Sequence, residues 1–150
     1  MSAGDLGPVL FAYDGSDLAR LAIEEAGRQL ERGREAVVLT VWRPFGVGFI
    51  PPPEVKFDAA ASDQVSQAAE ATAAQGASMA QAAGFHTQSL AIKEATTWKG
   101  IARVADDCDA SLIALGSHGK RGLAGVFLGS VAGAVAAHSG RTVLIVHRRA

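Results

Sequence analysis

The segment ASLIALGSHGKRGLAGVFLGSVAGAVAAHSGRTVLIVH, residues 110–147, carries two short apolar runs, with a glycine-rich stretch and an alanine-rich stretch between them. The runs at 110–116 and 141–147 have the length and composition of buried strands. Residues 129–140 have the composition of a helix. A strand, a helix and a second strand in this order predict two parallel strands joined by a helical crossover.

The same alternation extends back to the start of the chain. Three further strands and three further helices are predicted in turn, at residues 8–13, 16–33, 36–42, 59–83, 87–93 and 96–108. Three consecutive prolines exclude regular structure from the segment 43–57. No internal repeat and no linker divides the chain. We therefore expect an α/β fold: a single doubly wound, Rossmann-like domain over residues 1–150 with a five-stranded parallel sheet.

The first helix carries its own start and stop signals. Ser16 or Asp17 is expected to be its N-cap, because a side-chain oxygen at that position accepts a hydrogen bond from a free backbone N–H. Gly33 is expected to close the helix as its C-cap.

Composition narrows the class of protein. The chain has 150 residues, 49% of them hydrophobic, which is enough for one compact core. Fourteen basic residues against fifteen acidic ones give a net charge of −1, so charge favours neither nucleic acid nor a membrane surface as the partner. The start of the chain lacks the features of a signal peptide, and the lone cysteine, Cys108, is expected to be a packed, reduced thiol. These features favour a cytoplasmic protein.

The glycine-rich stretch at 116–130 indicates a function. Its glycines recur every three residues from Gly116 to Gly125, and Gly129 directly precedes Ser130. The stretch begins at the carboxyl end of a predicted strand and ends at the first turn of a predicted helix. Backbone N–H groups at such a place bind phosphate, and glycine lets the main chain approach it. Ser130 is expected to cap the helix or to donate its hydroxyl to the phosphate.

Two known phosphate motifs do not match this stretch. The Walker A motif requires a serine or threonine after Gly-Lys, whereas Gly119-Lys120 is followed by Arg121. A dinucleotide fingerprint would follow the first strand, where AYDGSD stands instead. A turn closed by a serine cap is the alternative interpretation.

The spacing of the stretch resembles the G-x-x-G-(nine residues)-G-[ST] signature of the universal stress protein family. VLFAYDGSDLARLAIEEA, residues 9–26, is similar to the first strand and helix of that family, and residues 110–147 are similar to its last quarter. The sequence departs from the family at Ser111, where an Asp is usual, and at TTWKG, residues 96–100.

The resemblance implies a member of the ATP-binding subgroup with the sheet order 3-2-1-4-5. It implies ATP as the bound cofactor, with any Mg²⁺ held mainly by the phosphates, and a homodimer paired through the strand at 141–147. It also implies the residues of the site. The adenine contacts would be Ala12 and the backbone of Val41, with Tyr13 beside them and Asp14 near the ribose. The phosphates would meet two stretches: Gly116, Ser117, His118, Gly119, Lys120, Arg121 and Gly122, then Gly129, Ser130 and Val131.

Other interpretations stay open. Asp14 is also explained as an acid of the turn formed with Gly15 and Ser16. His118 suggests catalysis, but the sequence offers no residue to orient it, so hydrolysis of ATP is expected to be slow or undetectable. The rival functions are a slow ATPase and a module of the same fold that binds only proteins. No catalytic residue and no metal site is predicted, since His86, His138 and His147 lack metal-ligand spacing.

Overall fold

The computed structural model describes residues 6–43, 59–119 and 128–148, with the backbone alone described for 59–61. These residues form nine elements in strict alternation: β1 (Val9–Ala12), α1 (Asp17–Gln29), β2 (Glu35–Trp42), α2 (Ala59–Ala82), β3 (His86–Lys93), α3 (Thr97–Asp107), β4 (Leu112–Gly116), α4 (Ser130–His138) and β5 (Val143–Val146).

The strands form one parallel sheet in the order β3-β2-β1-β4-β5, which confirms the expected fold class and strand order. Val9 of β1 lies opposite Ala36 of β2 on one side and Leu112 of β4 on the other. The chain winds outward from β1 to β3, then crosses over to β4 and continues to β5. The winding therefore reverses between β1 and β4.

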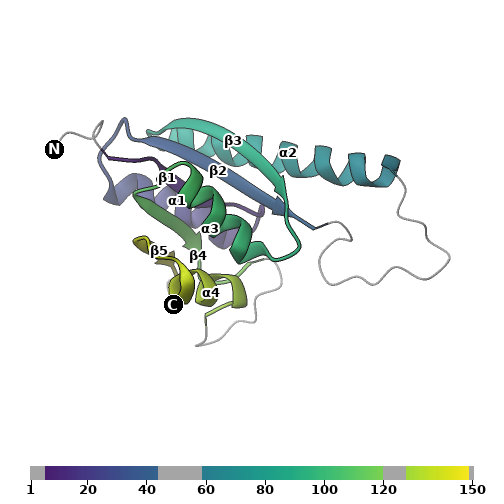
Figure 1. Cartoon of the computed structure of the whole chain (residues 1–150). Helices are drawn as coiled ribbons and strands as arrows, with labels where there is room; N and C mark the ends of the chain where they lie inside the picture. The colour runs from purple at the N-terminus through teal and green to yellow at the C-terminus, as the bar shows by residue number, and fades with distance from the viewer. Residues whose placement is uncertain (1–5, 44–58, 120–127, 149–150) are drawn as a thin grey trace.

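Helices cover both faces of the sheet (Figure 1). On one face, Phe11 and Val38 pack with Ile23 of α1 and Ala80 of α2 in a buried cluster. On the other face, Leu10 and Leu39 pack with Ile101 of α3 and Val135 of α4. Because the central strands β1 and β4 are covered on both sides, their sequences are apolar without alternation, whereas the edge strand β3, HTQSLAIK, carries exposed and polar residues.

The ends of the first helix agree only partly with the sequence signals. Ser16 is the N-cap, and its hydroxyl accepts the backbone N–H of Ala19 at 3.2 Å. The expectation that Gly33 is the C-cap is wrong: α1 ends at Gln29 with Leu30 as the cap. Gly33 lies in the turn that follows the helix. Its φ of +87° is a left-handed conformation, which glycine adopts more readily than other residues.

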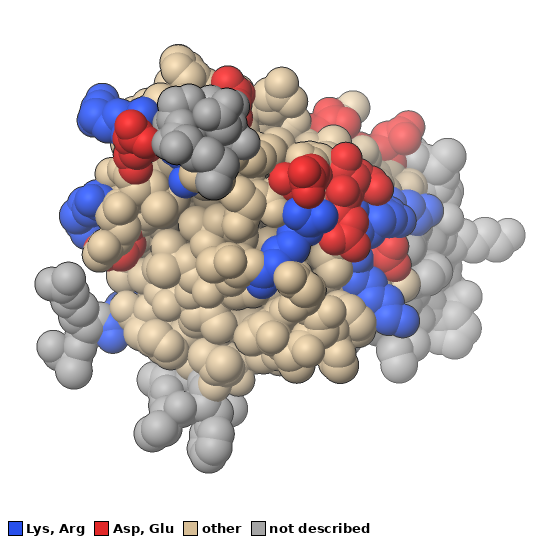
Figure 2. All heavy atoms as spheres, turned by 60° about the vertical axis from the view of Figure 1, so that its left-hand side comes forward, with Lys and Arg blue, Asp and Glu red and all other residues tan. Residues whose placement is uncertain are grey.

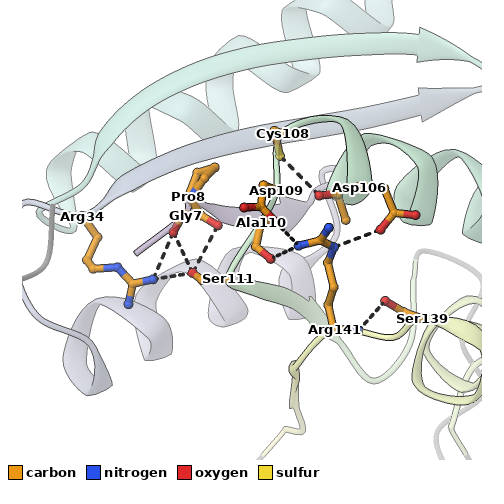
Figure 3. A network of polar contacts seen from close by, with 11 residues as sticks. Gly7, Pro8, Arg34, Asp106, Cys108, Asp109, Ala110, Ser111, Ser139 and Arg141 are labelled. Carbon is orange, nitrogen blue, oxygen red and sulfur yellow. Dashed lines mark hydrogen bonds and ion pairs between the residues drawn. The ribbon is translucent and has the colours of Figure 1, made fainter. Parts of the chain in front are cut away.

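A buried arginine lies at the amino-terminal edge of the sheet (Figure 3). Arg34, 7% exposed, donates from Nη2 to the hydroxyl of Ser111 at 2.6 Å and to the carbonyl of Gly7 at 3.4 Å. The Ser111 hydroxyl in turn donates to the Gly7 carbonyl at 2.7 Å. Ser111, the departure from the family pattern, thus connects the starts of β1, β2 and β4.

A second arginine holds the end of α3 to the start of β5. Arg141 donates to Asp106 and Asp109 at 3.0 Å each and to the carbonyl of Ala110 at 2.6 Å (Figure 3). These hydrogen bonds raise the pKa of Arg141. Nearby, burial raises the pKa of the Cys108 thiol, as expected of a packed, protonated cysteine.

The surface carries charges of both signs. On the face turned forward in Figure 2, acidic and basic side chains lie side by side. Within the three described ranges, no helix combines the length and the apolar character that crossing a bilayer demands.

Candidate functional site

A pocket of about 100 Å³ opens at the carboxyl ends of the strands, where the winding reverses between β1 and β4. Ligands of open α/β sheets bind at this place. Its walls come from β1, β2, β4, α1, α3 and α4 together with the turns that follow β1 and β4. The lining residues are Ala12, Tyr13, Asp14, Ser16, Ala19, Leu39, Val41, Thr97, Ile101, Leu115, Gly116, His118, Gly119, Val131 and Ala132.

The turn after β1 is held by two hydrogen bonds to residues of β2. The backbone N–H of Tyr13 donates to the carbonyl of Leu39 at 2.9 Å, and the buried Thr40 hydroxyl donates to the carbonyl of Tyr13 at 2.8 Å. Asp14 follows, and its Oδ1 accepts the backbone N–H of Ser16 at 2.9 Å. Asp14 is therefore a turn acid, as the alternative interpretation holds, while it also lines the pocket.

The end of β2 presents backbone groups toward the pocket. Successive residues of a strand turn their N–H and C=O to opposite neighbours. The carbonyl of Trp42 accepts Glu94 from the β3 side at 3.0 Å, and that of Leu39 accepts Tyr13 from the β1 side at 2.9 Å. The N–H and C=O of Val41 therefore point to the β1 side of β2. They lie past the level of Tyr13, whose bond to Leu39 follows the pairing of β1 with β2. Val41 accordingly lines the pocket.

The two ends of the glycine-rich stretch meet. The N–H of Gly129 donates to the carbonyl of Ser117 at 2.7 Å, and the N–H of Ser117 donates to the carbonyl of Val146 at 2.8 Å. The two described ends of the stretch are thus joined to each other and attached to the end of β5. Lys120, Arg121 and Gly122 lie outside the described residues.

Three described glycines of this loop allow close packing. A Cβ on Gly116 would lie 2.7 Å from Cβ of Leu18 in α1, and one on Gly119 would lie 2.7 Å from Oδ2 of Asp14. A Cβ on Gly129 would lie 3.0 Å from the carbonyl oxygen of Ser117. The bare side of Gly116 therefore faces α1, although the residue also lines the pocket. The absence of a side chain lets Gly119 lie close to Asp14, and lets Gly129 lie close to Ser117 and His118.

The first turn of α4 faces the pocket. Gly129 is its N-cap and offers no side-chain hydrogen bond, whereas α1 has a serine cap. The N–H groups of Ser130, Val131 and Ala132 belong to the first turn, which has no intrahelical acceptors for them. Ser130 is the first helical residue, so the expectation that it caps the helix is wrong, and its exposed hydroxyl is available to a ligand.

His118 has a neighbour that the sequence did not indicate. Its Nδ1 lies 3.2 Å from the hydroxyl of Ser117, a side chain only 2% exposed. A hydroxyl orients the ring but does not stabilise its protonated form as a carboxylate does. Within the described residues, no group of three or more His, Cys, Asp or Glu side chains could hold a metal ion.

The structure adds residues to the site that sequence reasoning missed. Thr97 and Ile101 of α3 and Ala132 of α4 line the pocket beside the predicted residues. The apolar stripe of α3 predicts that Ile101 is buried, but no pattern along the chain indicates that α3 reaches the carboxyl end of β2.

The model of the universal stress protein family matches residues 6–147. The chain belongs to this family. The universal stress proteins Rv2005c of Mycobacterium tuberculosis and Mb2028c of Mycobacterium bovis are each 33% identical to it over 150 residues, covering 95% of the chain. The alignment covers 45% of each relative, so the chain spans about half of their length.

Solved structures agree on the fold. The hypothetical protein MJ0577 superposes with a TM-score of 0.78 at 23% identity, covering 96% of this chain and 97% of the other. A universal stress protein in complex with cAMP gives a TM-score of 0.66 at 25% identity over 95% and 98% of the chains. One from Archaeoglobus fulgidus in complex with dAMP gives 0.65 at 20% identity over 93% and 96%.

Proposed function

We propose that this universal stress protein binds an adenine nucleotide, ATP in particular, at the carboxyl-end pocket and acts as a stress-response regulator rather than as an efficient enzyme. The observation that carries the proposal is that Val41, at the end of β2, and Val131 and Ala132, in the first turn of α4, line one pocket. The complex of a family member with cAMP supports the choice of an adenine nucleotide. We also propose that the chain is one cytoplasmic domain.

The base end of the pocket suits adenine. Val41 offers an N–H donor and a C=O acceptor in sequence, and adenine offers the ring acceptor N1 beside its amino donor N6. Leu39, Ile101 and Val131 supply apolar surface around that pair. A buried base needs both apolar contact and satisfied polar edges.

The phosphate end is open. A volume of about 100 Å³ is well below the ~300–1,000 Å³ of pockets that enclose a whole drug-sized ligand. The base and ribose would fill it, and the phosphates would lie outside against the free N–H groups of Ser130 and Val131 and the partial positive charge of the helix N-terminus. Any Mg²⁺ would be held mainly by the phosphates. Asp14 would face the ribose.

Two variants test this proposal. In Gly119→Ala the new Cβ meets the Asp14 carboxylate at 2.7 Å and must displace it. Gly140→Ala is the matched control, since a Cβ there meets nothing within 4 Å. We expect calorimetry to show ATP binding to wild type and to Gly140→Ala, and at least tenfold weaker binding to Gly119→Ala, with unchanged melting temperatures.

Mass spectrometry of small molecules released from the heat-denatured protein identifies the nucleotide independently. We expect an adenine nucleotide. Wild-type protein that neither carries nor binds any adenine nucleotide would refute the proposal and leave the protein-interaction module as the function.

We also propose a homodimer through β5. This strand pairs with β4 through the carbonyls of Thr142 and Val146, so the N–H and C=O of Val143 and Ile145 turn to the free edge. A groove of about 930 Å³ runs between this edge and α1 and is lined by Leu21, Leu30 and Leu144 among others. An apolar groove beside an open strand edge suits a second copy across a two-fold axis.

The substitution that tests the dimer is chosen outside the two core clusters. Val143 and Ile145 pack against the α3–α4 cluster, so charging them, as their position in the strand first suggests, would also damage the fold. Leu21→Asp instead places a charge in the groove. We expect light scattering to show a dimer for wild type and a monomer for Leu21→Asp. Leu90→Asp on β3, at the opposite edge, should leave the dimer intact; dissociation by that variant alone would place the interface at β3.

A further inference from the structure

We propose that Arg43 is a specificity-determining residue of the nucleotide site, whose guanidinium donates a hydrogen bond to ring nitrogen N7 of the bound adenine. This inference rests on the proposed function.

Arg43 lies directly after β2 and reaches the wall of the pocket. Its Nη2 makes a long hydrogen bond of 3.4 Å to the hydroxyl of Thr97, the first residue of α3. Thr97 and Val41 both line the pocket. The guanidinium therefore lies next to a residue that lines the pocket, on the side of the sheet covered by α3, while Arg43 itself is not among the lining residues.

One N–H donor of the Arg43 guanidinium lacks an acceptor among the described residues. Nε of Arg43 is buried and has no hydrogen-bond partner among the residues that the structure describes. Burial of an unsatisfied donor of a charged group is costly, and a ligand that supplies an acceptor removes the cost. The long bond to Thr97 leaves the guanidinium weakly held, so it can adjust to such an acceptor.

The direction of β2 determines which ring atom meets Arg43. Along the strand, the N–H of Val41 comes before its C=O, and Arg43 follows two residues later. An adenine whose N1 accepts the N–H and whose N6 donates to the C=O presents N7 next along its edge. N7 is an acceptor, and a guanidinium is a donor only.

The same arrangement excludes other bases. A guanine at this place would turn its acceptor O6 to the C=O of Val41, which leaves two acceptors facing each other. A pyrimidine has no N7 for Arg43. The backbone, through N1 and N6, and the guanidinium, through N7, would therefore together select adenine.

The probe is 7-deaza-ATP, which differs from ATP by a C–H group in place of N7. Calorimetric titrations measure the affinity of each nucleotide for three proteins: wild type, Arg43→Met and Lys93→Met. Lys93 is the matched control, a cation at the end of β3 that lies over the ring of Trp42, 5.7 Å from its centroid. Trp42 neighbours Val41 in β2, so its side chain points to the opposite face of the sheet.

We expect wild type and Lys93→Met to bind ATP about tenfold more tightly than 7-deaza-ATP, a ratio in the range of hydrogen bonds to charged groups. In Arg43→Met the two affinities should become equal through loss of ATP affinity. Arg43→Lys, which keeps a charged donor, should retain part of the preference.

Equal affinity of wild type for the two nucleotides would refute the role of Arg43 and leave the proposed function standing, as would an undiminished preference in Arg43→Met. The wild-type comparison needs no variant, so it decides the matter even if Arg43→Met fails to fold. Failure of wild type to bind ATP at all would instead refute the proposed function, and this inference with it.

Discussion

The backbone N–H of Gly129 donates a 2.7 Å hydrogen bond to the carbonyl of Ser117, and this bond closes the base of the glycine-rich loop. It uses the amide of the N-cap residue, so in the proposed complex the phosphates would bind the amides that follow it in α4. It also explains why position 129 must be small, because a Cβ there would lie 3.0 Å from the Ser117 oxygen and 3.3 Å from Cα of His118.

Gly129→Val should therefore weaken ATP binding strongly by forcing the two ends of the loop apart. We expect a loss of at least tenfold in affinity by calorimetry, with the far-ultraviolet circular dichroism of the folded protein retained. Affinity equal to that of wild type would show that the closed base of the loop has no part in binding.

Gly116 and Gly133 should respond to alanine in opposite directions. In Gly116→Ala the Cβ would lie 2.7 Å from Cβ of Leu18 and 2.9 Å from its backbone carbon, so α1 must shift. We expect a loss of about 1–3 kcal/mol in the free energy of unfolding, measured with urea. Gly133 lies inside α4 with its nearest neighbour at 4.0 Å, so Gly133→Ala should gain about 0.5–1 kcal/mol from helix propensity. Destabilisation by both variants would contradict this explanation of Gly116.

Ser111→Ala should destabilise the protein, because it leaves the buried guanidinium of Arg34 without its 2.6 Å acceptor. The expected loss in the free energy of unfolding is about 1–3 kcal/mol. Ser78→Ala, at an exposed position of α2, serves as the control and should change stability by less than about 0.5 kcal/mol. An equal effect of the two variants would show that the contact between Arg34 and Ser111 contributes nothing measurable.

Hydrolysis of bound ATP should be much slower than the ~1 s⁻¹ at the low end of ordinary enzymes. His118 is oriented by the Ser117 hydroxyl, which cannot stabilise a protonated ring as a carboxylate would. In the proposed complex the amides of α4 would hold phosphate in the ground state and the transition state alike, which would lower no barrier. A phosphate-release assay checks this. A rate near 1 s⁻¹ that disappears in His118→Ala would make the protein an ATPase.

The fold was accessible from the sequence because its evidence is local. Apolar runs and helical patterns alternate along the chain, and a parallel sheet with helices on both faces is the compact way to bury them. The strand order was accessible only through the family resemblance, since periodicity does not say which strands become neighbours.

The site was predictable where its residues follow one another and hidden where they come together through packing. Of the predicted residues of the turns after β1 and β4, Tyr13, Asp14, His118 and Gly119 line one pocket, whereas Ser117 does not. The reason for Gly116 could not be read from the chain, because it depends on how close α1 lies to β4. Arg43 and Thr97 stand 54 positions apart, on elements that only the folded structure brings together.

The central claim is that an adenine nucleotide binds with its base at Val41 and its phosphates at the first turn of α4. Titration of ATP into ¹⁵N-labelled protein, followed amide by amide, tests it most directly. We expect the amides of Val41, Gly119, Ser130 and Val131 to shift together and to saturate at one nucleotide per chain, while those of β3 facing solvent stay in place. Shifts confined to the groove between α1 and β5, or no shifts at all, would contradict the claim.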